Sequence, residues 1–189
     1  KIIHNGFDLN VWKPSLFIKE QIRNKFNINK SNIIVGFAAR YHPMKDISNF
    51  LSAMKIVLKE KSNVNLIMVG EGLDEKFAND FSLYKKFPNK KFILLGPVEN
   101  LHEIMPAFDI LCLSSAWGEG FPNVIAEAIN YNCLIISAKN FGGARQLIGN
   151  EDKGLYYNLY DPKDLVKKIK YSIENKDLII KKILKSKKN

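Results

Sequence analysis

Two glutamates, Glu119 and Glu127, frame the segment with the most chemical information in this chain. Between them lie a Gly–Phe–Pro–Asn turn and a short helix-like run, and the apolar run 109–114 before them predicts a buried strand. The first amides of a helix have no partner inside the helix, so a helix that starts after a strand can bind an anion. Two carboxylates would repel a phosphate there. Sugar hydroxyls suit them better, because an ionised carboxylate only accepts hydrogen bonds.

Two basic residues, Arg40 and Lys45, follow another predicted strand at 33–39. An arginine and a lysine at the mouth of a crevice can neutralise a diphosphate, although alone they fit an ordinary surface turn equally well. Ligands of open parallel sheets bind outside the carboxyl ends of the strands. Because both motifs follow strands, we expect them to face one crevice.

The elements that must position these residues alternate along the chain. Continuous apolar runs predict strands that are covered on both faces, at 33–39, 64–69, 91–95, 109–113, 133–137 and, more weakly, 154–157. Helical patterns fall at 47–58, 73–87, 101–108, 121–131 and onward from the Asp161–Pro162 start signal. This alternation predicts an α/β fold with a Rossmann-like parallel sheet of about six strands and helices on both faces.

The run Ser114-Ser-x-x-Gly-Glu-Gly-Phe-Pro-Asn, which continues to Glu127, resembles the signature of the group 1 retaining glycosyltransferases, which have the two-domain GT-B fold. The resemblance extends from His4-Asn5-Gly6-Phe7-Asp8, similar to the family's domain-linking motif, to about Pro162. It implies that residues 1–175 form a nucleotide-sugar (donor) binding domain, one half of a GT-B fold. Residues 176–189 are then a lysine-rich helix or frayed tail, and we expect an N-terminal acceptor domain to lie outside this chain.

The same resemblance assigns roles to single residues. Glu127 would hold the ribose, Glu119 would contact the transferred hexose, and Arg40 and Lys45 would bind the diphosphate and assist its departure. The loop at Val98 would touch the nucleobase. The stretch whose backbone approaches the hexose and diphosphate comprises Gly118, Gly120, Phe121, Pro122 and Asn123. The implied catalytic residues are Arg40, Lys45 and Glu119.

Several positions depart from the family pattern. Gln146 stands where the family usually has a glutamate, three residues after Gly143, and Asp46 follows Lys45 where a glycine is frequent. We expect Asp46 to cap the following helix. The small–Gly ending of the signature helix is absent, and Asn132 is the residue predicted to cap that helix in a left-handed conformation. The Gly142–Gly143 pair predicts close packing or a close approach to the donor.

Composition limits the partners. The chain has 189 residues and a net charge of +10, of which ten lysines against three acidic residues in 163–189 supply most. This distribution favours the solvated face of an amphipathic helix, leaves peripheral contact with acidic lipid open, and predicts no nucleic-acid partner. The sequence has no Asp-x-Asp and no metal-ligand spacing, so we expect no metal and no cofactor besides the donor. Cys112 and Cys133 are predicted to be small buried hydrophobes.

The function implied by the resemblance is transfer of a hexose from a nucleoside diphosphate sugar, expected to be UDP-linked, to a glycan or lipid-linked acceptor. The expected setting is bacterial surface polysaccharide or lipopolysaccharide synthesis, in the cytoplasm or at the inner face of the plasma membrane. This chain alone should bind donor weakly and transfer little sugar. Two alternatives stay open. A GT-B sugar-nucleotide epimerase would share the crevice, and a non-enzymatic nucleotide- or nucleic-acid-binding module would use the basic charge.

Overall fold

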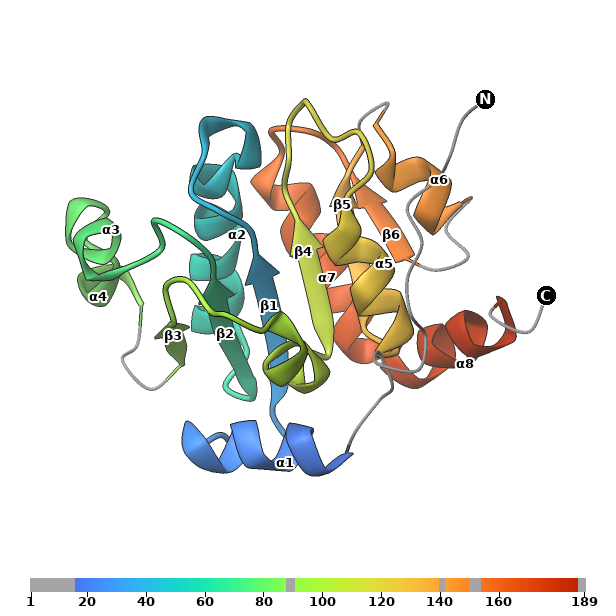
Figure 1. The fold of residues 1–189 in the computed structure, drawn as a ribbon, viewed down its shortest axis with the longest axis horizontal. Coiled ribbons are helices and arrows are strands. Elements are labelled where there is room, and N and C mark those ends of the chain that lie inside the picture. Colours follow the sequence, from blue (N-terminus) through green and yellow to red (C-terminus); the bar gives the residue numbers. More distant parts are fainter. Residues whose placement is uncertain (1–15, 88–90, 140–141, 150–153, 187–189) are drawn as a thin grey trace.

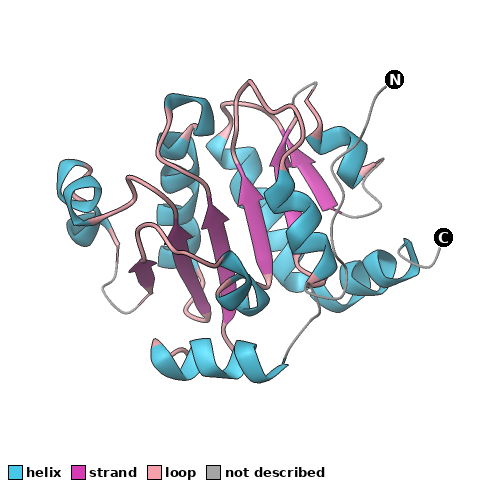
Figure 2. Ribbon diagram, viewed as in Figure 1, coloured by secondary structure: helices cyan, strands magenta, loops and turns pink. Residues whose placement is uncertain are grey.

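A six-stranded, all-parallel sheet forms the centre of the computed structural model, which describes residues 16–87, 91–139, 142–149 and 154–186. Its strands lie side by side in the order β3-β2-β1-β4-β5-β6 and point the same way (Figure 2). Their bounds are β1 Ile33–Ala38, β2 Val64–Val69, β3 Phe92–Leu94, β4 Ile110–Leu113, β5 Leu134–Ala138 and β6 Gly154–Tyr157. The predicted α/β class and all six predicted strands are confirmed.

The strand order reverses between β1 and β4. β1 pairs with β2 on one side and with β4 on the other, where Val35 lies opposite Ile110. The chain therefore leaves β1 and β4 in opposite lateral directions, which opens a crevice at their carboxyl ends. Both motifs singled out above follow these two strands.

Helices cover both faces of the sheet (Figure 1). One face is packed by α2 and α7, with α3, α4 and α8 at its margins, and the other by α1, α5 and α6 together with short 3₁₀ turns. The bounds are α1 Leu16–Lys25, α2 Ile47–Glu60, α3 Glu75–Asp80, α4 Leu83–Lys86, α5 Asn123–Asn130, α6 Ala144–Ile148, α7 Pro162–Glu174 and α8 Lys176–Ser186, with 3₁₀ turns η1 Pro43–Lys45, η2 Leu101–Glu103 and η3 Met105–Ala107. The apolar residues that recur at helical spacing in the predicted helix 47–58 are all buried in α2: Ile47, Phe50, Leu51, Met54, Val57 and Leu58.

Two predicted helices differ in the structure. The segment 73–87 is divided into α3 and α4 by Ser82, whose φ of 51° interrupts the helical backbone. The segment 101–108 forms η2 and η3 instead of one helix, because Pro106 has no amide hydrogen to donate within a helix. Helix α1 was not predicted from the sequence.

Three helix ends lie where the sequence predicts them. The Asp161 carboxylate accepts hydrogen bonds from the Lys163 and Asp164 amides, both at 3.0 Å. Asn132 has a φ of 58° and ends α5 as predicted. Asp46 occupies the N-cap position of α2, as predicted, in a left-handed conformation with a φ of 44°.

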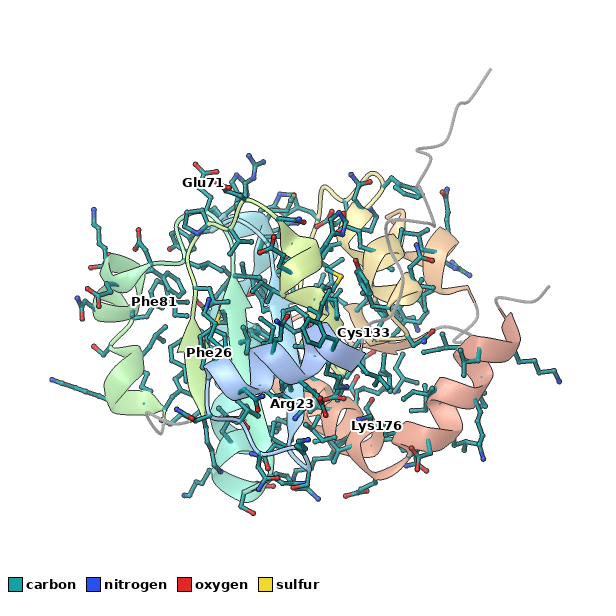
Figure 3. The ribbon with its side chains drawn as sticks, turned by 60° about the horizontal axis from the view of Figure 1, so that its bottom comes forward. Arg23, Phe26, Glu71, Phe81, Cys133 and Lys176 are labelled. Atoms are coloured by element: carbon teal, nitrogen blue, oxygen red, sulfur yellow. The ribbon has the colours of Figure 1, made fainter. Side chains whose placement is uncertain are left out.

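A buried carboxylate holds α1 and α8 against the amino end of β4. Asp109 Oδ1 lies 2.7 Å from Lys19 Nζ and 2.6 Å from Lys176 Nζ, while Oδ2 lies 2.9 Å from an Arg23 guanidinium nitrogen and accepts the Ile34 amide at 2.9 Å. Arg23 and Lys176 lie at the end of the molecule away from Glu71 (Figure 3). Asp109 thereby fixes the two helices at the end of the sheet opposite to the crevice.

Several other predictions concern the chain ends and the cysteines. Cys112 and Cys133 are buried and free, as predicted. The lysine-rich segment forms α8 and buries Ile179 and Ile183. The His4–Asp8 motif and residues 187–189 lie outside the described residues. Over the described ranges, every helix is too short or too polar to cross a bilayer.

Candidate functional site

A pocket of about 410 Å³ lies at the carboxyl ends of the strands. Its walls come from segments far apart in the sequence: Arg40 follows β1, Glu71 follows β2, Val98 follows β3, and Asn123 and Glu127 lie on α5. The lining combines one cation, Arg40, and two carboxylates, Glu71 and Glu127, with apolar residues such as Ala38 and Val69 at the strand ends. Such a combination suits a ligand with an anionic part and hydroxyl groups.

Backbone hydrogen bonds join the loops that form this pocket. The Ala39 amide donates to the Val69 carbonyl at 3.0 Å, Tyr41 to Glu71 at 2.7 Å, and Gly70 to Gly96 at 2.8 Å. Gly70 has a φ of 148°, and a Cβ there would lie 1.9 Å from the Ala39 carbonyl oxygen. This close approach requires glycine. The carboxyl edges of β1, β2 and β3 therefore continue as one connected rim.

Glu127 is one of two carboxylates that line the pocket, together with Glu71. It lies one turn after Asn123 on α5, and both residues line the pocket, as the predicted helical spacing requires. Burial raises the pKa of Glu127 to about 7. Near neutral pH the side chain is therefore easily ionised by a partner that donates hydrogen bonds to the carboxylate.

A second pair of functional candidates lies beside this pocket rather than in its wall. Lys45, at the end of η1, forms an ion pair with Glu119 Oε1, and both side chains are largely buried, at 12% and 9% exposure. Ser115 Oγ donates a hydrogen bond to the same carboxylate oxygen. The ion pair joins the loop after β1 to the loop after β4.

The two loops are also joined through the backbone. Ser114 Oγ donates to the Lys45 carbonyl, and the Ala116 amide donates to the Met44 carbonyl at 2.8 Å. His42, which the sequence placed in the same turn, accepts a hydrogen bond from the Met44 amide at 3.2 Å through Nδ1. These contacts hold the η1 turn against the end of β4.

The Gly142–Gly143 pair packs against the loop that carries Glu119. The Gly143 amide donates to the Glu119 carbonyl at 3.0 Å, and a Cβ on Gly143 would lie 1.8 Å from the Gly120 carbonyl oxygen. The predicted close packing is confirmed. The loop 118–122, which contains Gly118, Gly120, Phe121 and Pro122, is thus fixed at its middle before α5 begins.

The structure brings the sequence candidates together in two groups. Arg40, Val98, Asn123 and Glu127 line the pocket, whereas Lys45 and Glu119 pair with each other. Glu71 lines the pocket as well, although it was not predicted from the sequence. The available signal was position, because Glu71 follows β2 as Arg40 follows β1. Within the described ranges, no group of three or more His, Cys, Asp or Glu side chains could hold a metal ion.

Comparisons with known proteins identify the family of this chain. Residues 18–188 match the family model of the group 1 glycosyl transferases. The chain is 27% identical over 172 residues to a UDP-Gal:alpha-D-GlcNAc-diphosphoundecaprenol alpha-1,3-galactosyltransferase from Escherichia coli, an alignment that covers 85% of this chain and 41% of that protein. The chain spans between 33% and 45% of the length of the curated relatives it matches.

Solved structures show the same fold. Anabaena HepE, crystallised with UDP-glucose, superposes with a TM-score of 0.82 at 25% identity over 97% of this chain and 50% of its own. The C-terminal domain of the group 1 glycosyl transferase LpcC from Francisella tularensis superposes with a TM-score of 0.78 at 21% identity, covering 94% of this chain and 93% of that one. Because the family model matches nearly the whole chain, the chain belongs to the group 1 glycosyltransferase family.

Proposed function

We propose that this chain is the C-terminal, donor-binding half of a retaining glycosyltransferase that transfers a hexose from a UDP-linked sugar to a glycan or lipid-linked acceptor. One observation carries the proposal. Arg40, Val98, Asn123 and Glu127, which come from three separate segments, line one pocket at the point where the strand order reverses. The named activity of the Escherichia coli relative and the UDP-glucose bound to HepE support the choice of a UDP-sugar.

Each residue of the site binds the part of the donor that suits its chemistry. Arg40 pairs with the diphosphate through its planar guanidinium, and Lys45 and the first amides of α5 complete the anion site. Glu127 accepts hydrogen bonds from the ribose hydroxyls. Val98 and its neighbour Pro97 provide an apolar wall for the uracil ring. Glu119 reaches the hexose, and the backbone of Gly118–Asn123 follows the sugar and the diphosphate.

Transfer then depends on positioning and on charge. As the glycosidic bond breaks, negative charge grows on the diphosphate, and donors that are already oriented stabilise that charge without reorganising. Arg40, Lys45 and the α5 amides supply this stabilisation in our proposal, so that no metal is needed. The acceptor site, the outcome at the anomeric carbon and the membrane-side setting of polysaccharide or lipopolysaccharide synthesis belong to the whole protein and are part of the same proposal.

Calorimetric titration tests the proposal. UDP, GDP and ADP are titrated into the 189-residue chain, followed by UDP-glucose, UDP-galactose and UDP-N-acetylgalactosamine. We expect saturable binding of UDP and of at least one UDP-sugar. Glu127→Ala should weaken UDP binding about tenfold, because a hydrogen bond to a charged group is lost from a partly buried site.

Glu75→Ala is the matched control, since Glu75 is an exposed glutamate on α3 outside the pocket. Equal losses in the two variants would contradict the assigned role of Glu127. Absence of binding by all six ligands to a folded sample would overturn the donor-site proposal for the chain. Salt-sensitive binding of a polynucleotide in that same sample would instead favour the nucleic-acid alternative.

A further inference from the structure

Ser114 and Ser115 directly follow β4, where the loop that carries Glu119 meets the η1 turn that carries Lys45. We propose that this serine pair consists of positioning residues: Ser114 holds the Lys45 turn and Ser115 holds the Glu119 carboxylate, so that both groups meet a sugar nucleotide in fixed orientation. The inference rests on the proposed function and names residues to which neither the sequence nor the family comparison gave a role.

Both serine side chains are buried. Ser114 and Ser115 are 1% and 0% exposed, so that their hydroxyl groups have no access to bulk water. A buried hydroxyl without a hydrogen-bond partner is unfavourable, and therefore its partner is held in place as firmly as the hydroxyl itself. The partners here are the Lys45 carbonyl and Glu119 Oε1.

The two hydroxyl groups reach different segments of the chain. Ser114 reaches the η1 turn, 69 residues earlier in the chain, and Ser115 reaches the loop that its own strand enters. The pair thus fixes the loop after β1 relative to the loop after β4.

The Glu119 carboxylate is held through one of its two oxygens. Lys45 Nζ and Ser115 Oγ both approach Glu119 Oε1. Neither uses the second oxygen, Oε2. A carboxylate that is held through one oxygen presents the other in a defined direction, which is what a hexose hydroxyl requires from an acceptor. Without Ser115, Glu119 keeps one flexible lysine as its side-chain partner.

Other buried serines of the described chain show that this use is not a consequence of burial alone. Ser137, in β5, donates at 3.3 Å to the carbonyl of its own neighbour, Ala138. Ser172, in α7, is fully buried, and its hydroxyl has no hydrogen-bond partner among the described residues. Ser172 provides a matched control, because its replacement removes a buried hydroxyl far from the two motifs.

The test compares a nucleotide with its sugar conjugate. UDP and UDP-glucose (or GDP and GDP-mannose, if GDP is the nucleotide bound) are titrated into the unaltered chain and into Ser114→Ala, Ser115→Ala and Ser172→Ala. Ser115→Ala should weaken UDP-glucose about tenfold and change UDP by less than about twofold, since Glu119 meets only the sugar. Ser114→Ala should weaken both ligands by similar factors, since Lys45 meets the diphosphate. Ser172→Ala should change neither.

A double variant separates positioning from general damage. If Ser115 acts through Glu119, adding Ser115→Ala to Glu119→Gln should produce no further loss of UDP-glucose affinity. Additive losses would overturn the inference. Thermal unfolding checks that each variant is folded. Ser115→Cys, which keeps the shape and weakens the donor, takes the place of Ser115→Ala if the alanine variant does not fold, and should show the same selective loss.

The outcomes distinguish this inference from the function on which it rests. If the unaltered chain binds neither a nucleotide nor a nucleotide sugar, the proposed function fails and the inference with it. If the unaltered chain binds both but Ser115→Ala loses both equally, or loses neither, the inference alone is wrong.

Discussion

The Lys45 ammonium group and the Glu119 carboxylate form a largely buried ion pair between two loops whose residues are 74 positions apart. The loops follow β1 and β4, which are neighbours in the sheet although β2 and β3 lie between them in the chain. The pair therefore belongs to neither motif alone. It exists because the sheet places the carboxyl ends of these two strands side by side.

Removing one partner of this pair should lower the stability of the fold. Lys45→Met leaves a carboxylate of 9% exposure without its cation, and we expect the free energy of unfolding to fall by about 2 to 3 kcal/mol. Lys45→Met combined with Glu119→Gln should recover most of that loss, because no buried charge is then left unpaired. Urea unfolding measures both variants, and a double variant as unstable as the sum of the single ones would contradict the expectation.

Donor affinity should depend on pH through Glu127. Its pKa is raised by burial to about 7, and a ribose hydroxyl donates to the ionised form. Binding therefore favours ionisation, so that UDP affinity should rise as the pH increases from 5.5 to 8.5 and level off above the pKa. Calorimetry of Glu127→Gln, which has no such titration, provides the comparison. A pH profile that is identical in the two proteins would exclude this role.

Folding stability should respond to the same group with the opposite sign. An ordinary glutamate has a pKa of 4.5, so between pH 4.5 and about 7 the folded protein binds more protons at Glu127 than the unfolded chain does. Stability should therefore decrease as the pH rises through this window. Glu127→Gln should remove that decrease, which thermal unfolding at pH 5 and pH 8 would detect as a smaller difference between the two midpoints.

Acid stability should depend on Asp109. Burial alone would raise its pKa, but Lys19 and Lys176 outweigh burial and hold the pKa below the ordinary value of 3.8. The stabilising contribution of the carboxylate is therefore complete above pH 3.8 and is lost as the pH falls through the lower, folded pKa. Asp109→Asn should destabilise the chain by about 3 to 5 kcal/mol at pH 7, and by less in acid. Asp80→Asn, at an exposed site on α3, is the control for these urea titrations.

Replacement by alanine should destabilise the fold at Gly143 but have little effect at Gly120, although the two glycines are in contact. A Cβ on Gly143 would lie 1.8 Å from the Gly120 carbonyl, whereas a Cβ on Gly120 has no heavy atom within 4 Å. Gly143→Ala must therefore displace the loop that carries Glu119 and should cost about 2 kcal/mol or more of stability, by the overpacking it introduces. Gly120→Ala should change the unfolding midpoint little. Similar midpoints for the two variants would show that the loops separate without strain.

The sequence by itself determined the strands of this protein and the main helices that cover them. Buried parallel strands are continuous apolar runs, and α2 repeats its apolar residues at helical spacing, so local patterns were enough to predict six strands and the main covering helices. The sequence also supplied Glu119, Glu127, Arg40 and Lys45 as candidates, since Arg40, Lys45 and Glu119 follow strand ends and Glu127 lies one turn into the helix that comes next. Asn132 was recognisable as a helix end because asparagine adopts the left-handed backbone conformation more readily than most residues.

The tertiary structure decided which of these residues meet. Whether Lys45 pairs with Glu119, whether Glu71 lines the pocket and whether Ser114 bonds to the Lys45 carbonyl depend on strand order, which no local pattern encodes. Helix α1 was missed for the same reason: Lys19 and Arg23 are fixed by Asp109, a partner about 90 residues away. The periodicity of apolar residues predicts which faces of a segment are buried. The partners that orient a charged side chain come from segments distant in the sequence, which meet only when the chain folds.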